Sequence, residues 1–423
     1  MMKTGYKKMR CALIGEHLGH SFSRMIHEKI ADYSYDLVEL TPDRVGDFVK
    51  NGDYDAFNVT IPYKKAVIPY LDRISPEAQR IGAVNTVVRR ADGSLDGYNT
   101  DYFGFSRMID VLGVDPVGKK AVVLGSGGAS VTVQTVLADR GAGKIIVVGR
   151  ALENNYGNID RHYDADIIVN TTPVGMYPNN GECPVELSNF KKCGAVLDLI
   201  YNPAKTQLLL EAEALSIPHI NGLSMLVAQA VRAYELFTRD GAESGIVEKI
   251  TDEISFATKN IILIGMPGCG KSTVGKLIAQ KTSRAFFDAD DEFTAMHGVT
   301  PAEAINTMGE EGFRELEHKT LCSLGKNSGA VIACGGGAVT REYNYAPLHQ
   351  NGIIVYLRRE LSRLATNGRP LSQSRSVESL YKARKEAYER FADVTADSTE
   401  IPEKTAELIL NELEKQGDER KEK

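Results

Sequence analysis

The chain is 423 residues long. At roughly 150 residues per domain, this length predicts about three structural units and excludes one small module. Hydrophobic residues make up 43% of the chain and charged residues 25%, which is typical of a globular protein and excludes a disordered or collagen-like chain. Fifty Lys and Arg against 56 Asp and Glu give a formal net charge of -6, which indicates no broad basic surface, so we expect no nucleic acid partner.

Six cysteines form no C-x-x-C pair and no metal-like spacing with the eight histidines, so we expect reduced thiols. The amino-terminal segment is basic, but its apolar stretch runs only from Cys11 to Gly15, which is too short for a signal peptide. Nowhere do about 18 apolar residues run together, so we expect no membrane span. These features predict a cytoplasmic protein, and they leave open whether it forms a homo-oligomer.

The first half of the chain has the pattern of an α/β fold. An α/β segment over 10–108 contains a hairpin turned at 91–94. The short β-branched runs 121–124 and 145–148 are separated by a helical stretch over 129–140, as in a strand-helix-strand unit.

Two further helices are expected over 224–237 and 245–254, and the next strand opens near Lys259. A second nucleotide-type unit follows, with a strand over 261–264 and a helix over 272–282 whose apolar residues share one face.

Gly265 to Ser272 fits the phosphate-loop pattern G-x-x-x-x-G-K-[ST] between a predicted strand and a predicted helix. The glycines allow backbone N–H groups to close on phosphates, the lysine reaches the terminal phosphates, and the serine offers an oxygen to Mg²⁺. An unliganded Gly-rich turn is the less favoured alternative. We place the following residues at a bound nucleotide, which we expect to be ATP: Gly268, Gly270, Lys271, Ser272 and Thr273.

Asp288 and Asp290 stand at the end of the next predicted strand, where one carboxylate could help to hold Mg²⁺ and the other could orient an attacking hydroxyl. A solvated turn or a helix cap is the competing interpretation. Thr300 to Glu303 is a capping box, with Pro301 at the first helical position, and is assigned only a structural role.

Over about residues 260–393 the chain resembles shikimate kinase. The phosphate loop is joined there by D-x-D at 288–290, G-F-R-x-x-E at 312–317, G-G-G at 335–337, R-P-L at 369–371 and a late arginine. The resemblance implies that Asp288, with Ser272, assists Mg²⁺ and that Asp290 is a catalytic residue that contacts the substrate hydroxyls. It also implies three residues that bind the substrate, namely Arg314, Gly336 and Arg384, and it places the two arginines on the substrate carboxylate. Arg369 would act from a mobile lid over 366–375 and stabilise charge on the transferring phosphoryl group.

In the first half, the segment from Asn58 to Lys64 alternates so that Asn58, Thr60 and Lys64 would share one face of an extended chain. That polar face could line a pocket for a polyol, or it could be the solvated side of an edge strand. Ser23 and Asp101 each precede a predicted helix, so helix capping is their alternative role.

Across about residues 10–250 the chain resembles shikimate dehydrogenase. The motifs are H-S-x-S at 20–23, N-V-T-x-P-x-K at 58–64, G-A-V-N-T at 82–86, N-T-D-x-x-G at 99–104, G-x-G-G-A at 125–129, N-x-T-P-x-G-M at 170–176 and G-L-S-M-L-V-x-Q-A at 222–230. The resemblance makes Lys64 and Asp101 the catalytic pair. This chemistry is consistent, because hydride delivery to a ketone leaves an alkoxide that needs a proton and a positive neighbour. The implied ligands of the substrate carboxylate are Ser21 and Ser23, and those of the ring hydroxyls are Asn58, Thr60, Asn85 and Gln229.

A dinucleotide pyrophosphate loop is expected after strand 121–124, although Ser130 departs from a strict G-x-G-x-x-G. The residues expected at the cofactor are Gly125, Ser126, Gly127, Gly128, Ala129, Arg150, Tyr201 and Gly222. Arg150, at the end of the next strand, favours the 2′-phosphate of NADP over the free ribose of NAD.

Two departures from the family pattern affect this cofactor site. The family usually has Asn-Arg-Thr where this chain has Gly149-Arg150-Ala151, followed by Glu153. Only residues 151–165 then precede the strand at 166–170, too few for the usual crossover helix and strand. We expect a trimmed cofactor domain, reduced cofactor affinity and a modest preference for NADP.

The two resemblances together predict an α/β protein with two consecutive activities. Residues 1–107, completed by helices at about 223–254, would form the substrate domain, 108–222 a trimmed Rossmann-like NADP domain, and 258–416 a P-loop kinase domain similar to the nucleoside monophosphate kinases. The first half would reduce 3-dehydroshikimate with NADPH, and the second would phosphorylate shikimate from MgATP.

Two alternatives remain open. One is a regulator that senses quinate or shikimate without turnover, which the presence of all the reactive residues disfavours. The other is a quinate dehydrogenase fused to a kinase for another small polyol.

Overall fold

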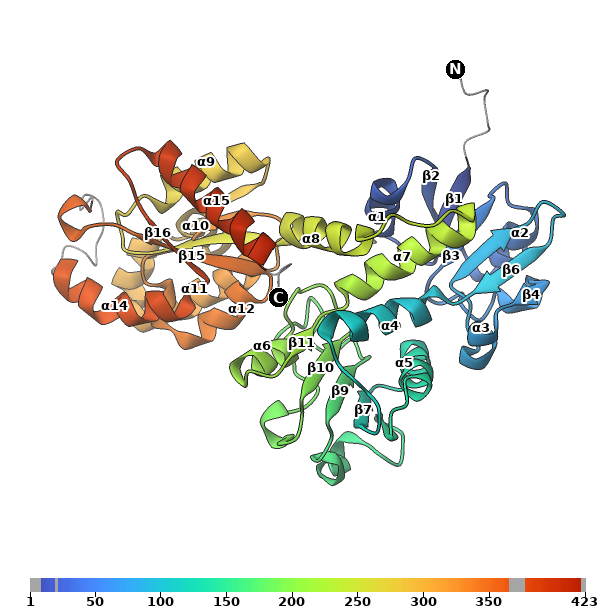
Figure 1. Ribbon diagram of the computed structural model, residues 1–423. Coiled ribbons are helices and arrows are strands. Elements are labelled where there is room, and N and C mark those ends of the chain that lie inside the picture. Colours follow the sequence, from blue (N-terminus) through green and yellow to red (C-terminus); the bar gives the residue numbers. More distant parts are fainter. Residues whose placement is uncertain (1–8, 20–21, 365–376, 420–423) are drawn as a thin grey trace, which may run out of the picture. The chain divides into compact units, whose positions relative to one another are not determined.

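The structure is a computed structural model that describes residues 9–19, 22–364 and 377–419 (Figure 1). The chain divides into two compact units. The first unit comprises the chain up to Val174 with Cys183–Tyr201 and Glu211–Glu253, and the second comprises Gly175–Glu182, Asn202–Leu210 and the chain from Ile254 onward. All six cysteines are free thiols. Among the described residues, no helix combines the length and the apolar character needed to cross a bilayer.

The first unit begins with a six-stranded mixed sheet in the order β2-β1-β3-β5-β6-β4. Its strands are β1 (Arg10–Gly15), β2 (Ser34–Glu39), β3 (Ala56–Val59), β4 (Arg73–Ile74), β5 (Thr86–Arg89) and β6 (Leu95–Tyr98), and its helices are α1 (Ser23–Ile30), α2 (Val45–Asn51) and α3 (Pro76–Ile81). Strand β1 pairs in parallel with β2 and β3, whereas β5 and β6 form an antiparallel hairpin. The predicted turn at residues 91–94 is confirmed, because the Arg90 N–H donates to the Ser94 carbonyl across it (2.8 Å).

A five-stranded parallel sheet follows in the order β11-β10-β9-β7-β8. Its strands are β7 (Lys120–Leu124), β8 (Lys144–Val148), β9 (Ile167–Asn170), β10 (Ala195–Asp198) and β11 (His219–Ile220). The helices of this part of the chain are α4 (Thr100–Leu112), α5 (Gly128–Asp139), α6 (Gln207–Ala214), α7 (Leu223–Thr238) and α8 (Ile246–Thr258).

The expected trimming of this sheet is confirmed. Between β8 and β9 the chain forms only the 3-10 helix Tyr156–His162, and β8 is an edge strand. A doubly wound sheet of the usual order 3-2-1-4-5-6 carries another strand outside that position. The short connection leaves no room for it.

Helices α4 and α7 pack closely because a glycine lies where they touch. A Cβ atom on Gly104 would lie 2.6 Å from the Met225 carbonyl oxygen and 3.2 Å from the Gln229 Cβ. Backbone at that distance leaves no space for a side chain. The glycine therefore brings the first turn of α4 close to Gln229 on α7.

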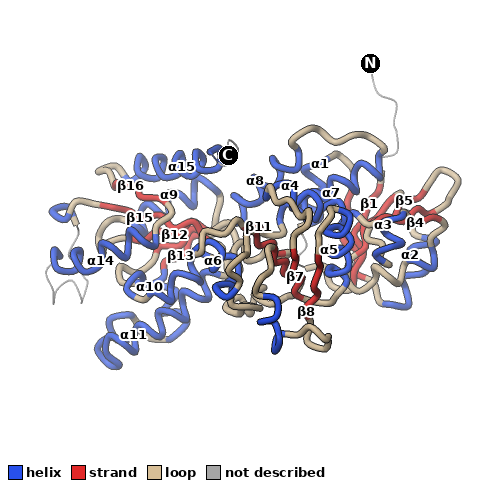
Figure 2. Tube along the Cα trace, turned by 60° about the horizontal axis from the view of Figure 1, so that its bottom comes forward, coloured by secondary structure: helices blue, strands red, loops and turns tan. Residues whose placement is uncertain are grey.

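The second unit contains a five-stranded parallel sheet in the order β13-β14-β12-β15-β16, and Figure 2 shows its strands among the surrounding helices. The strands are β12 (Asn260–Ile264), β13 (Phe286–Asp288), β14 (Val331–Ala333), β15 (Gly352–Arg358) and β16 (Val394–Asp397). The helices are α9 (Lys271–Thr282), α10 (Ala289–His297), α11 (Pro301–Gly325), α12 (Tyr345–His349), α14 (Val377–Phe391) and α15 (Pro402–Glu419). The predicted capping box at the start of α11 is confirmed, because Thr300 and Glu303 cap each other reciprocally.

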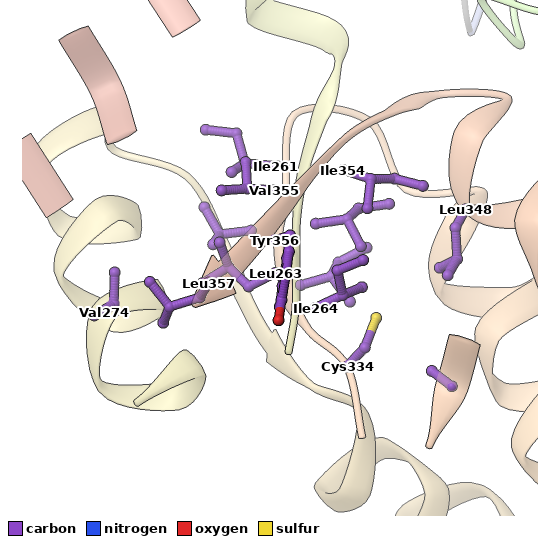
Figure 3. Close-up of a cluster of buried hydrophobic side chains, with 14 of the residues drawn as sticks. Ile261, Leu263, Ile264, Val274, Cys334, Leu348, Ile354, Val355, Tyr356 and Leu357 are labelled. Atoms are coloured by element: carbon purple, nitrogen blue, oxygen red, sulfur yellow. The ribbon is translucent and has the colours of Figure 1, made fainter. Parts of the chain in front are cut away.

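The core of the second unit surrounds the central strands β12 and β15 (Figure 3). All five residues of β12 are buried, as expected for a central parallel strand covered on both faces. Tyr356 of β15 stacks on Tyr388 of α14 with ring centroids 5.0 Å apart. This packing fixes the carboxyl end of β12, from which the phosphate loop leaves.

Candidate active sites

Lys64 and Asp101 form an ion pair in the first unit. The Lys64 Nζ lies 2.6 Å from the Asp101 Oδ2, and the two side chains are 30% and 20% exposed. Lys64 lies in the turn that follows β3, and Asp101 lies in the first turn of α4. The pair is therefore formed before a ligand binds, and it remains accessible to one.

The expectation that Asn58 to Lys64 form one extended segment is wrong beyond Val59. Strand β3 ends at Val59, the Ile61–Pro62 peptide bond is cis, and residues 61–67 form turns. The Lys64 carbonyl accepts a bond from the Val84 N–H (2.8 Å), which anchors the turn on the neighbouring segment. Lys64 thus reaches Asp101 from a turn rather than from the face of a strand.

The capping roles considered for Asp101 and Ser23 are also wrong. The cap of α4 is Asn99, whose side-chain oxygen accepts a bond from the Tyr102 N–H (3.2 Å). Helix α1 begins at Ser23 itself, with Phe22 in the cap position and no side-chain cap bond. Because Asn99 caps α4, the Asp101 carboxylate is left to pair with Lys64.

The amides expected to bind ring hydroxyls are joined by hydrogen bonds. Asn58 Nδ2 donates to Thr86 Oγ1 (3.0 Å), which donates to Asn85 Oδ1 (3.1 Å). Thr100 Oγ1 contacts both Asn85 Oδ1 (3.2 Å) and Gln229 Oε1 (3.4 Å). The structure thus brings Asn58, Asn85 and Gln229 together from β3, the segment before β5, and α7.

Other predicted residues lie around these groups. Phe22, next to Ser23, packs against Tyr201 with ring centroids 5.4 Å apart. Gly15 ends β1 beside Thr60, and a Cβ atom on this glycine would lie 2.6 Å from the threonine methyl group. Ser21, the other predicted carboxylate ligand, lies outside the described residues.

The loop after β7 has the shape of a dinucleotide-binding turn. Gly125 has a φ of 104°, and a Cβ atom there would lie 2.7 Å from Thr171 Oγ1. Gly127 and Gly128 lead into α5 with open space beside their Cα atoms, so their backbone is accessible to a pyrophosphate. Ser126 and Ala129 complete this loop.

Two other predicted cofactor residues lie at strand ends of the same sheet. Gly222 precedes α7, where a Cβ atom would lie 2.1 Å from the Leu199 carbonyl oxygen, so only glycine fits. Arg150 is exposed and follows β8 by two residues.

The second unit contains a cavity of about 590 Å³ at the carboxyl ends of its parallel strands. Except for Arg369, which lies outside the described residues, every residue predicted for the second site lines it. These residues are Gly268, Gly270, Lys271, Ser272, Thr273, Asp288, Asp290, Arg314, Gly336 and Arg384.

The phosphate loop holds its lysine within its own curve. The Lys271 ammonium donates to the carbonyl oxygens of Gly265 (2.9 Å) and Met266 (3.0 Å). Ser272 Oγ donates to Asp288 Oδ2 (2.5 Å), so the two predicted Mg²⁺ ligands lie side by side. Asp288 also caps α10, since its other oxygen accepts from the Asp290 N–H (3.1 Å). The helix-cap interpretation of Asp288 is therefore confirmed, and its role at Mg²⁺ remains a prediction.

Arg314 is a buried arginine whose guanidinium faces the cavity. Its Nη1 lies 2.6 Å from Glu317 Oε2, and its side chain is only 3% exposed. Burial raises the pKa of Glu317, and Arg314 opposes that rise. A Cβ atom on Gly337 would lie 2.1 Å from Arg314 Nη2, so the glycine run makes room for the guanidinium.

Arg384 reaches the same glycine run from α14. Its Nη1 donates to the Gly336 carbonyl (3.0 Å), to which the Tyr388 hydroxyl also donates. A Cβ atom on Gly336 would lie 2.6 Å from the side chain of Pro267 in the phosphate loop. Gly336 and Gly337 therefore allow the phosphate loop and the two arginines to approach one segment of backbone.

The family model of the shikimate dehydrogenase substrate binding domain matches residues 13–87. A shikimate dehydrogenase (NADP(+)) from Clostridium perfringens is 38% identical over 264 residues, which cover 57% of this chain and 97% of that protein.

The chain belongs to the shikimate dehydrogenase family. The family model of shikimate kinase matches residues 267–414, so the chain joins a shikimate dehydrogenase to a shikimate kinase domain.

Solved structures of shikimate dehydrogenases share the fold of the first part. One is a chorismate mutase/shikimate 5-dehydrogenase fusion protein from Clostridium acetobutylicum, with a TM-score of 0.56, 37% identity and coverage of 59% of this chain and 97% of that one. Another is the shikimate 5-dehydrogenase of Thermus thermophilus in complex with NADP(H) and shikimate, with a TM-score of 0.53, 30% identity and coverage of 58% and 99%.

The shikimate kinase cavity contains a residue that the sequence analysis did not predict. Arg359 lines it just after β15, and its Nη1 lies 4.0 Å from the position of a Cβ atom on Gly270. The signal in the sequence was an arginine at the carboxyl end of an apolar strand, where ligand sites of parallel sheets form. Without the strand order, nothing indicated that this end lay beside the phosphate loop.

Proposed function

We propose that the protein reduces 3-dehydroshikimate to shikimate with NADPH and then phosphorylates shikimate from ATP. Lys64 and Asp101 carry the first reaction, and the cavity with the phosphate loop, Arg314 and Arg384 carries the second. One observation supports the proposal that the two reactions are consecutive. The cavity of the second unit combines a phosphate loop with two buried arginines that are suited to one carboxylate. The product of the first step has that carboxylate.

In the dehydrogenase site, the Lys64 ammonium supplies the proton and the positive charge that the reduced carbonyl oxygen requires. Asp101, 2.6 Å away, holds the ammonium in place and balances its charge. Asn58, Asn85 and Gln229 orient the ring through its hydroxyls, with Thr60 beside them. Ser21 and Ser23 would hold the carboxylate, and Ser23 is the first residue of α1.

NADP(H) fits the loop after β7, because the open backbone of Gly127 and Gly128 can receive a pyrophosphate at the start of α5. When bound, the cofactor supplies the hydride. Arg150 would contact the 2′-phosphate, and Tyr201 and Gly222 would lie near the nicotinamide. No second basic residue follows Arg150 before Glu153, which supports a modest preference for NADP.

In the kinase site, Lys271 and the glycines of the phosphate loop hold the phosphates of ATP, with Thr273 in the first turn of α9. ATP supplies the phosphoryl group. Ser272 and Asp288 would hold Mg²⁺, and the hydrogen bond between them supports this proposal, because it brings the two side chains together. Asp290 orients the attacking hydroxyl, Arg314 and Arg384 hold the carboxylate with Gly336, and Arg369 balances charge on the transferred group.

The domain boundaries also remain proposals: 1–107, completed by the helices near 223–254, for the substrate domain, 108–222 for the NADP domain and 258–416 for the kinase. We further propose a cytoplasmic location and Mg²⁺ as the cation.

A coupled time course tests the whole proposal. Purified protein receives 3-dehydroshikimate, NADPH and MgATP, and loss of NADPH and formation of ADP are followed together. We expect NADPH loss to begin at once and ADP to follow after a lag, as shikimate accumulates. Omission of NADPH should abolish both signals, and added shikimate should restore ADP formation alone. A protein that binds shikimate and shows neither signal would instead be a sensor.

A further inference from the structure

A buried hydrogen-bond chain leads from β2 to the proposed substrate amides. The Tyr35 hydroxyl donates to Asn58 Oδ1 (2.8 Å), Asn58 Nδ2 donates to Thr86 Oγ1 (3.0 Å), and Thr86 donates to Asn85 Oδ1 (3.1 Å). All four residues are buried. Only the two asparagines were predicted to contact substrate, so Tyr35 is a new member of the site.

The chain has one direction, because each amide has one end that only accepts and one that only donates. Since Tyr35 donates to Asn58 Oδ1, the amino group of Asn58 must face Thr86. Asn85 Oδ1 in turn accepts from Thr86 and from the Thr100 N–H (2.7 Å). The amino group of Asn85 is thereby directed away from these donors, so a substrate hydroxyl oxygen at this position meets a donor.

Tyr35 can reach Asn58 because of the strand order. Strand β1 lies between β2 and β3, with Tyr35 opposite Cys11 and Asn58 opposite Leu13. Two strands separated by a third lie about 9.5 Å apart, a span that requires a side chain as long as tyrosine. A shorter hydroxyl residue in β2 could not make this bond.

The tyrosine ring is held in place by His27. The two rings stack with centroids 3.9 Å apart and planes at 12°. His27 is fully buried, and burial lowers its pKa to about 3, so the ring is neutral near pH 7. Its Nδ1 lies 2.5 Å from the Tyr33 hydroxyl, which fixes the ring in turn. Tyr33 and Tyr35 therefore both contact His27, but only Tyr35 has its hydroxyl on Asn58.

We propose that Tyr35 is a positioning residue of the dehydrogenase, which holds the Asn58 amide in place through its Oδ1 and so supports the Asn58-Thr86-Asn85 network that contacts the ring hydroxyls. This inference rests on the proposed function, because it takes Asn58 and Asn85 as ligands of the substrate ring. Tyr35 itself touches neither the proton donor Lys64 nor the cofactor loop in any contact found among the described residues.

The test compares Tyr35→Phe with Tyr33→Phe in the full-length protein. Each variant loses one buried hydroxyl beside His27, so the two should lose similar thermal stability. Tyr35→Phe removes the hydroxyl that donates to Asn58 Oδ1, and we expect the KM for shikimate in the dehydrogenase reaction to rise about tenfold. Its kcat should stay within about twofold and its KM for NADP⁺ should not change, because the Lys64–Asp101 pair and the cofactor loop are intact. Tyr33→Phe should keep the wild-type KM for shikimate.

The kinase activity of the same molecules is the internal reference and should be equal in all three proteins. A series of shikimate analogues, each lacking one ring hydroxyl, adds a second measurement. The analogue that lacks the hydroxyl bound by the chain should be used equally well by wild type and by Tyr35→Phe, because the bond that distinguishes them is absent.

Three results would overturn the proposal: an unchanged KM in Tyr35→Phe, an equal rise of KM in both variants, or a fall in kcat with KM constant. Wild-type protein without dehydrogenase turnover would be a different failure. It would remove the proposed function and this inference with it, before any variant is compared.

Discussion

The two proposed sites handle charge in different ways. The dehydrogenase site places one ion pair, Lys64–Asp101, beside a network of neutral amides and hydroxyls. The kinase cavity gathers Lys271, Arg314 and Arg384 against Asp288, Asp290 and Glu317. A ketone reduction develops charge on one oxygen, whereas phosphoryl transfer involves several phosphate oxygens throughout. The proposed site with more charged side chains is therefore the one whose reaction has more charge to stabilise.

The two sites also differ in how far their main groups are assembled before a ligand binds. Lys64 already contacts its proposed catalytic partner, but the Lys271 ammonium is bound to carbonyl oxygens of its own loop. Nucleotide phosphates would replace those carbonyls. The dehydrogenase pair therefore needs little rearrangement, whereas the kinase lysine must exchange partners.

The largest expected effect is a reciprocal loss of the two activities. Lys64→Ala removes the proposed proton donor and should lower dehydrogenase kcat by about a thousandfold while sparing the kinase. Lys271→Ala removes the phosphate ligand and should lower kinase kcat/KM by about a thousandfold while sparing the dehydrogenase. Separate steady-state assays of each activity measure both effects.

Circular dichroism and thermal unfolding serve as controls for folding in both variants. If either substitution silenced both activities in a folded protein, the two sites would not be independent.

The next largest effect tests the role of the glycine run at residues 335–337. Gly337→Ala places a Cβ atom where the Arg314 guanidinium lies, so the KM for shikimate in the kinase reaction should rise about tenfold to a hundredfold. Its neighbour gives a matched comparison, since a Cβ atom on Gly336 would lie against Pro267 of the phosphate loop, so Gly336→Ala should raise the KM for ATP as well as the KM for shikimate. Equal effects of both variants on both KM values would argue against this division.

A smaller effect is expected at Arg150. Wild-type kcat/KM should favour NADPH over NADH by less than about a thousandfold, or roughly 4 kcal/mol, because the proposed contact with the 2′-phosphate comes from one exposed cation. Arg150→Ala should lower kcat/KM for NADPH about tenfold and leave the value for NADH unchanged. A wild-type preference above a thousandfold would contradict the proposed consequence of the trimmed cofactor domain.

The smallest effect concerns acid stability of the first unit. An unfolded histidine binds a proton below about pH 6.5, but buried His27 does not until about pH 3, so the unfolded state gains protons first as pH falls. The contribution of His27 to the free energy of unfolding is therefore fully present above about pH 6.5, and it decreases as pH falls below that value. Between pH 6.5 and 5.5, His27 alone should lower the free energy of unfolding by about 1 kcal/mol.

Hydrogen exchange of the β1 and β2 amides measures this change. His27→Gln should flatten the pH dependence, whereas His17→Gln, at an exposed position, should not alter it. A wild-type curve that is flat over this range would refute the assignment.

Much of the fold and of the site was predictable from the sequence because local patterns determined it. The phosphate loop lies between the expected strand and helix, since its glycines and lysine specify the turn themselves. The short stretch between 151 and 165 predicted the missing strand, because a parallel crossover has a minimum length. The motifs also predicted that Lys64 and Asp101 act together, and the structure brings them into an ion pair, whereas the helix-capping alternative for Asp101 is wrong because Asn99 caps α4.

Only the tertiary structure decided which distant groups act on one another. Lys64 meets Asp101 through a turn that the alternating pattern did not predict, because strand β3 ends at Val59 and residues 61–67 form turns. Arg359 joins the phosphate loop through strand order, and Tyr35 reaches Asn58 across β1 for the same reason. A sequence specifies periodicity and turns within a few residues, but contacts between strands depend on the order in which the whole chain packs, and that order is set by burial of the entire core.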